Sequence, residues 1–293
     1  MRKSERPCSI PESLLWTCSY QFGQALVLLA FFYLLVFAGY GFDWPSQDVI
    51  LQLAMDLNLD RSFLLIGVTS LGALFVVVPL IRLRLGPRFR ESIGWRTPRH
   101  EEVIFALATV IPIAVLGDLI YELSGSFLQA GITQRLSSQT LQTSSLEYLQ
   151  STLHGVPYPI LVVALALGPA VGEELIFRGV IGRGLVHRHG VWTGSVMTAF
   201  LFAIAHVSPS HAISTLPIAF LLQFLYLKTG TIWIPIFVHF CNNLVAVSMM
   251  RYEFVPDINI SPFAAIGFLS YLIVILVAFE SRRRNWNVSQ DFV

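Results

Sequence analysis

The chain has 293 residues, of which 55% are hydrophobic and only 13% charged, whereas a soluble domain carries about 25% charged residues. This composition leaves too little polar surface for a water-soluble enzyme, and it also excludes a disordered chain. Three cysteines are too few for a disulfide-rich secreted module, and a net charge of +1 argues against a nucleic-acid partner.

Eight hydrophobic segments are candidates for spanning helices, each of which needs roughly 20 apolar residues. In chain order they are 22–41, 63–81, 103–121, 158–178, 192–208, 212–227, 231–250 and 262–279. The first is too long and begins too late for a signal peptide, so we expect it to be retained. The sequence predicts an all-α, polytopic transmembrane bundle that forms one integral-membrane domain over 1–293. The longest loop, 122–157, is predicted to include an amphipathic surface helix at 136–149.

Lysine and arginine predict the orientation, because cytoplasmic loops carry the excess of basic residues. With eight spans, 15 basic residues fall on the side of both termini and three on the other, with Arg178 set aside inside a span. Both termini are therefore predicted to be cytoplasmic. The Arg-rich inner loops and short termini are typical of a bacterial or organellar protein, and the bacterial inner membrane is the expected location. The basic segment 82–99 could bind anionic membrane lipid, although ordinary topology-setting charge is the favoured explanation.

Polar side chains that are costly to bury lie late in the chain, between 158 and 250. They are Glu173, Glu174, Arg178, His206, His239 and Asn243. Glu174 and Arg178 are four residues apart and can form an ion pair, whereas Glu173 is rotated about 100° away and has no partner in its own helix. A buried, unpaired carboxylate must be protonated or take part in chemistry. Pro169 predicts a kink just before the two glutamates.

Two later spans add imidazoles and an amide. Phe202 and His206 share one helix face, and His239 and Asn243 share another. Each pair alone could be structural hydrogen bonding between helices. Together with Glu173 they supply a base for water and donors for an oxyanion, or alternatively a zinc shell made of Glu173, His206 and His239. Both alternatives predict hydrolysis of a carbonyl compound, most simply a peptide bond.

Other hydrolase signatures are missing from the sequence. It has no His-Glu-x-x-His motif, no Gly-x-Ser-x-Gly motif and no pair of intramembrane aspartates. Cys241 is rotated about 200° from His239, which disfavours it as a nucleophile.

The three polar motifs resemble those of the CAAX-protease and bacteriocin-processing (CPBP or ABI) family of intramembrane proteases, which includes type II CAAX prenyl endopeptidases. The matching motifs are Glu173-Glu174-x-x-x-Arg178-Gly179, Phe202-x-x-x-His206 and His239-x-x-x-Asn243, with Thr229–Pro235 as the lead-in. The resemblance covers about a quarter of the chain.

The resemblance implies a role for each residue. Glu173 would be the general base, with His206 assisting it or holding a metal. His239 and Asn243 would stabilise the oxyanion, and Glu174 and Arg178 would support the site. Whether the mechanism uses zinc stays open, although the amide of Asn243 is a poor metal ligand. One requirement is that Glu173 and His206, about 10 Å apart by helical rise, meet in the fold.

Two other functions are compatible with the sequence. A membrane scaffold or immunity-type protein could use the same fold to bind a partner or a peptide. A transporter could use Glu173 and the histidines as a proton relay, but no repeat between the two halves supports it.

Overall fold

The structure, a computed structural model, describes residues 7–43, 45–52, 62–133, 156–206, 208–252 and 262–290. Within these ranges every regular element is a helix, which confirms the predicted all-α class. The long helices are α1 (Ile10–Tyr40), α3 (Ser62–Leu85), α5 (His100–Thr133), α11 (Pro209–Thr229), α12 (Trp233–Tyr252) and α13 (Pro262–Gln290). The shorter ones are α4 (Phe89–Ser92) and α10 (Val191–Ile204). The remaining span, 158–189, is a composite of five helical segments.

Each predicted span coincides with a helix. Six helices are long and apolar enough to cross a bilayer by length and composition. Of the other two, α3 has 24 residues and α10 only 14, which is too short to cross alone. Four predicted boundaries are wrong, because the first helix begins at Ile10 rather than 22, and the third, fourth and eighth helices continue past 121, 178 and 279. Hydropathy marks where the hydrocarbon ends, whereas a helix can continue into the polar interface. The predicted surface helix at 136–149 lies outside the described residues.

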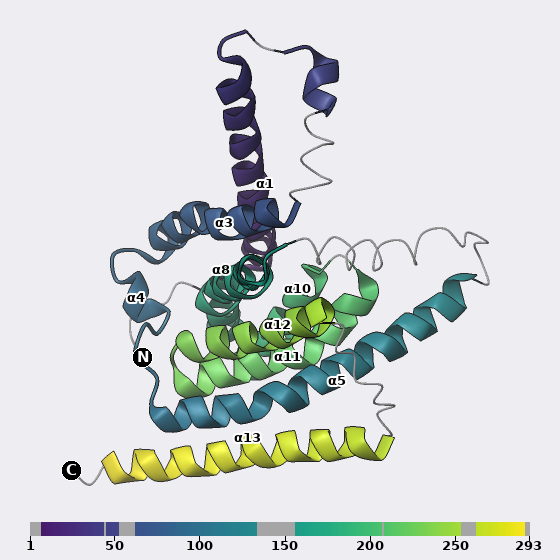
Figure 1. The fold of residues 1–293 in the computed structure, drawn as a ribbon. Coiled ribbons are helices and arrows are strands. Elements are labelled where there is room, and N and C mark those ends of the chain that lie inside the picture. Colours follow the sequence, from purple (N-terminus) through teal and green to yellow (C-terminus); the bar gives the residue numbers. More distant parts are fainter. Residues whose placement is uncertain are drawn as a thin grey trace.

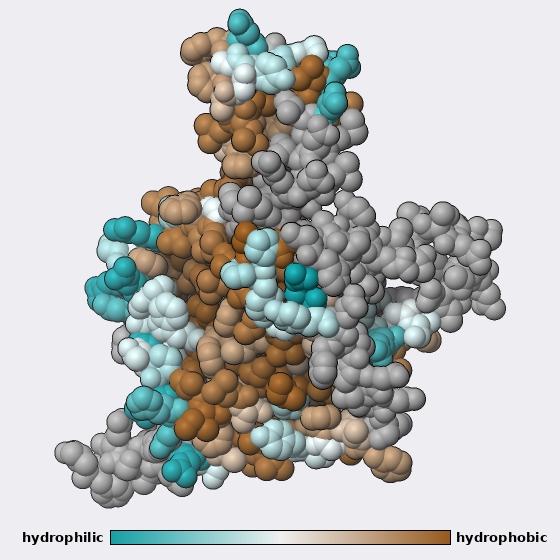
Figure 2. All heavy atoms as spheres, in the orientation of Figure 1, coloured by the Kyte–Doolittle hydropathy of each residue, from teal (hydrophilic) through white to brown (hydrophobic). Residues whose placement is uncertain are grey.

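The helices surround α8, the middle segment of the composite span (Figure 1). It contacts α1, α3 and α12, while α5 packs against α11, α12 and α13 on the far side. Helix α1 stands across the direction of α5 and α13 (Figure 1). On the face drawn in Figure 2, apolar residues cover much of the bundle, and hydrophilic residues lie mainly at its left margin and top, with a smaller group near the centre. This largely apolar face fits a bundle surrounded by lipid.

Ion pairs gather at one edge of the bundle, where α5 and α12 begin and α11 and α13 end. The pairs are Arg96 with Glu102 (3.0 Å), Lys228 with Glu280 (2.8 Å) and Arg282 with Glu101 (4.0 Å). Helix α4 lies at the same edge, at the left of Figure 1. Basic residues from four segments therefore share one edge, as the predicted orientation requires.

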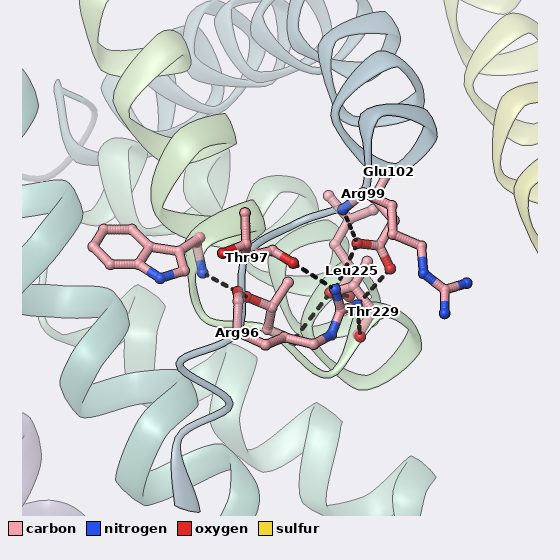
Figure 3. A network of polar contacts seen from close by, with 8 residues as sticks. Arg96, Thr97, Arg99, Glu102, Leu225 and Thr229 are labelled. Carbon is pink, nitrogen blue, oxygen red and sulfur yellow. Dashed lines mark hydrogen bonds and ion pairs between the residues drawn. The ribbon is translucent and has the colours of Figure 1, made fainter. Parts of the chain in front are cut away.

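A polar network joins the segment after α4 to the turn between α11 and α12 (Figure 3). Arg96 donates hydrogen bonds to Glu102 and to the carbonyl of Thr229, and Thr231 Oγ1 donates to the carbonyl of Arg96 at 2.7 Å. The backbone N–H of Ile232 donates to the carbonyl of Gly94 at 3.1 Å. These bonds fix the beginning of α12, the helix that carries His239.

Candidate active site

The helix that carries the two glutamates switches from an α-helical to a π-helical hydrogen-bond pattern twice. Its segments are α7 (Tyr158–Leu161), the π-helical η1 (Val162–Leu167), α8 (Gly168–Ile176), the π-helical η2 (Phe177–Gly182) and α9 (Arg183–His189). Pro169 lacks an N–H and cannot bond to the carbonyl of Leu165, so a regular α-helix is interrupted there. The irregularity therefore falls where Pro169 predicts a kink, and it takes the form of a π-helical segment. Such segments are frequent at functional sites.

Glu174 is the centre of a buried ion-pair network. Its Oε1 accepts a hydrogen bond from Arg178 Nη1 at 2.8 Å, which is the pair expected from their spacing. The same oxygen lies 2.8 Å from Nδ1 of His239, a contact between residues 65 positions apart that the sequence did not indicate. The side chains of Glu174 and Arg178 are completely buried and that of His239 nearly so. One carboxylate therefore links α8 and η2 to α12.

Arg178 extends this network to α10 and α11. Its Nη2 donates to the carbonyl of Ala219 at 3.0 Å, and its guanidinium lies 4.7 Å above the ring of Phe202. The Phe202 ring also contacts the imidazole of His239, with centroids 5.8 Å apart. Phe202, 1% exposed, thus fills the space between the ion pair and the two histidines.

His206 lies at the end of α10, beside Phe202. Its Nδ1 is 2.9 Å from the carbonyl of Phe202, and a carbonyl only accepts, so Nδ1 carries the proton. In the neutral ring this leaves Nε2 with a free lone pair. The ring also meets that of His211 edge-on, at 4.6 Å. His211 was not predicted as a site residue. It lies in the first turn of α11, five residues after His206.

Glu173 and Asn243 have no hydrogen-bond partner among the described residues. Glu173 is half-buried, and its Oε2 is a buried carboxylate oxygen without a donor in that part of the chain. Asn243 is half-buried on α12, one turn beyond His239. No hydrogen bond joins Glu173 to His206 within the described ranges, so the expected cooperation between them would need a water or substrate atom to bridge them.

The arrangement does not fit the three-ligand zinc shell of Glu173, His206 and His239. Among the described residues, no group of three or more His, Cys, Asp or Glu side chains is close enough to hold a metal ion. The two histidines do share a feature of metal ligands, because the Nδ1 of each is bonded to an oxygen and its Nε2 points elsewhere.

Comparisons with known proteins point to one family. The family model described as "Type II CAAX prenyl endopeptidase Rce1-like" matches residues 155–245, which include every predicted site residue from Glu173 to Asn243. The chain is 28% identical over 198 residues to the "Putative membrane peptidase YdiL" of Bacillus subtilis (strain 168), covering 66% of this chain and 75% of that protein. It is 32% identical over 94 residues to the "Uncharacterized protein YpbD" of the same organism, covering 32% and 48%. No solved structure matches.

Proposed function

Because the chain belongs to the CAAX-protease and bacteriocin-processing family, we propose that it is an intramembrane endopeptidase whose water is activated by Glu173. The observation that carries this proposal is the contrast between the two adjacent glutamates. Oε2 of each glutamate is buried without a donor, but Oε1 of Glu174 is bonded to Arg178 and His239, whereas neither oxygen of Glu173 has a donor among the described residues. A carboxylate without a structural partner is free to take a proton from water.

The proposed reaction is hydrolysis of a peptide bond. Glu173 removes a proton from a water molecule as the water oxygen attacks the carbonyl carbon, with His206 Nε2 accepting a hydrogen bond from that water. The carbonyl oxygen becomes negatively charged, and donors from His239 and Asn243 stabilise it. When the carbon–nitrogen bond breaks, the proton on Glu173 passes to the leaving nitrogen. The products are a carboxylic acid and an amine.

The role of His239 as a donor depends on its protonation. Its Nδ1–H donates to Glu174, so only a second proton on Nε2 makes that nitrogen a donor. With that second proton, the charges of Arg178 and His239 balance those of Glu173 and Glu174. A balanced set is the arrangement that costs least in a low-dielectric interior.

A substitution at Glu173 tests the proposal. We expect Glu173→Gln, which keeps the shape of the side chain, to lower the rate of peptide cleavage by about 10²–10⁴-fold or to background. The assay uses a fluorogenic peptide and protein purified in detergent, with equal folded protein confirmed by gel filtration. Glu122→Gln is the control, because Glu122 is an exposed glutamate on α5. Normal cleavage by Glu173→Gln would refute the role of Glu173.

The same assay decides the question of metal dependence. Each protein is measured with a chelator, and again after zinc is added back. Activity that survives the chelator supports a metal-free glutamate mechanism, and activity that is lost and then restored by zinc supports a metalloprotease. A wild type that cleaves no peptide, yet captures a protein partner equally well with or without Glu173→Gln, would favour the scaffold alternative.

The remaining parts of the proposal concern setting and substrate. We place the protein in the bacterial inner membrane with both termini in the cytoplasm, surrounded by lipid and acting on a protein or peptide. The gathering of ion pairs at one edge and the Bacillus relatives support this setting. The name of the matched family model suggests CAAX-type substrates. Comparing cleavage of prenylated and unprenylated peptides in the same assay tests whether the enzyme requires a prenyl group.

A further inference from the structure

Tyr20 of α1 packs directly on the backbone of α8 beside the proposed base. A Cβ added to Gly172 would lie 2.3 Å from Cε2 of Tyr20, so only a glycine allows the ring this close. The ring is 2% exposed, and its hydroxyl donates a hydrogen bond to the carbonyl of Ser70 at 3.1 Å. Gly172 immediately precedes Glu173, and the phenol and the Glu173 carboxylate are close enough to interact electrostatically.

Helix α3 packs against the same face of α8. Ser70, which accepts the bond from Tyr20, lies against Gly168, where an added Cβ would be 2.7 Å from the Cβ of Ser70. Gln24 Nε2 donates to Ser70 Oγ at 3.3 Å, which is a second bond from α1 to the same residue. Gly168 and Gly172 are four residues apart and so share one helix face. Three helices therefore meet at two glycines of one face of α8.

These contacts of α1 and α3 are made to α8, the segment of the composite helix that depends most on packing against its neighbours. Helix α8 has nine residues between two π-helical segments, whose hydrogen bonds are less regular than those of an α-helix. On the α12 side, α8 is held by Glu174 and His239. On the α1 and α3 side, the contacts of Tyr20 and Ser70 with the two glycines hold it. The direction of the Glu173 side chain follows from the position of this short segment.

We propose that Tyr20 is a positioning residue for Glu173. Its ring fixes the backbone of α8 at Gly172, and the bond to Ser70 fixes the ring. This inference rests on the proposed function of Glu173. It assigns a role to α1 and α3, which lie outside the residues 155–245 that the family model matches.

Removal of the hydroxyl is the first test. We expect Tyr20→Phe to lower kcat about three- to tenfold with KM unchanged, because one buried hydrogen bond is lost while the ring stays. Tyr40→Phe is the matched control, since Tyr40 lies on the same helix and is 43% exposed. Equal thermal midpoints for the two variants separate positioning from stability. A kcat of Tyr20→Phe equal to that of Tyr40→Phe overturns the proposal.

A rescue experiment tests the contact itself. Gly172→Ala forces the α8 backbone away from the ring, and a shift of about 1 Å near a reacting group can cost 10²-fold in rate. Combining it with Tyr20→Ala makes room for the new methyl group. We expect the double variant to regain at least about tenfold in kcat over Gly172→Ala alone. A double variant no more active than Gly172→Ala overturns the proposal.

A measurement without substrate separates this inference from the proposed protease activity. Dicyclohexylcarbodiimide modifies protonated carboxyl groups in apolar surroundings, and mass spectrometry reports its adduct on Glu173. We expect the labelling rate of Glu173 to change about threefold or more in Tyr20→Ala and to stay the same in Tyr40→Phe. If the wild type cleaves no peptide, the proposed function fails while a changed labelling rate still supports positioning by Tyr20. Identical labelling in wild type and Tyr20→Ala, whether present or absent, overturns the positioning role.

Discussion

The composite helix 158–189 and α13 are both long and strongly apolar, yet they have opposite surroundings. In the most apolar 18-residue stretch of the composite helix, 56% of the residues are buried in the protein. In the corresponding stretch of α13, only 11% are buried. The composite helix carries the buried Glu174–Arg178 pair, whereas α13 places its charges near its end, at Glu280 and Arg282. Hydropathy therefore does not separate a helix that faces protein from one that faces lipid, and the position of ionisable residues does.

The largest expected effect is at the buried ion pair. Arg178→Met removes the cation and leaves Glu174 buried with a charge that only His239 can balance, so we expect a loss of about 3–5 kcal/mol of stability. The thermal midpoint and the yield of monodisperse protein in detergent measure it. Arg282→Met, at an exposed position near the end of α13, should change neither. Equal midpoints for both variants would show that the Glu174 network contributes nothing to the fold.

A second substitution separates charge from packing at this site. Adding Glu174→Gln to Arg178→Met removes the unpaired carboxylate and should restore part of the lost stability, because an isolated buried charge costs more than a neutral amide. A double variant less stable than Arg178→Met alone would mean that Glu174 is held mainly by His239.

Much of the fold and part of the site follow from the sequence. The helix positions follow from hydrophobic length, and the Glu174–Arg178 pair follows from a spacing of four, since both depend on residues close in the chain. The bond between Glu174 and His239 joins residues 65 positions apart, and the ring contact between His206 and His211 joins a residue just after α10 to one in α11. Such contacts depend on how helices pack, which local periodicity does not encode.

The π-helical segments show the same limit within a single helix. Pro169 marks an interruption, but the choice of a π register on both sides of α8 depends on what packs there. Gly168 and Gly172 indicate that another helix can approach closely, but only the fold shows that Ser70 and Tyr20 are the residues that do so. Sequence patterns thus indicate which residues are unusual for a membrane helix, whereas the partners of these residues depend on how the helices pack.

A packing substitution should show an intermediate difference between the two helices. Ala170 on α8 is completely buried, whereas Ala278 on α13 is exposed at the surface of the protein. We expect Ala170→Leu to cost about 1–3 kcal/mol because the added carbons have no space, and Ala278→Leu to be close to neutral. Thermal midpoints in the same detergent compare the two. A destabilising Ala278→Leu would indicate that a second protein surface covers α13.

The smallest effect is expected on the exposed face of α13. Val274 is 63% exposed, so its methyl groups contact lipid or detergent both before and after unfolding within the membrane. Val274→Ala should therefore cost less than about 0.5 kcal/mol, as is usual for surface substitutions. Val238→Ala on α12, where the valine is 0% exposed, leaves a cavity that lipid cannot fill and should cost about 2 kcal/mol. If Val274→Ala were as costly as Val238→Ala, α13 would have to be packed against protein rather than lipid, and the contrast between the two helices would be lost.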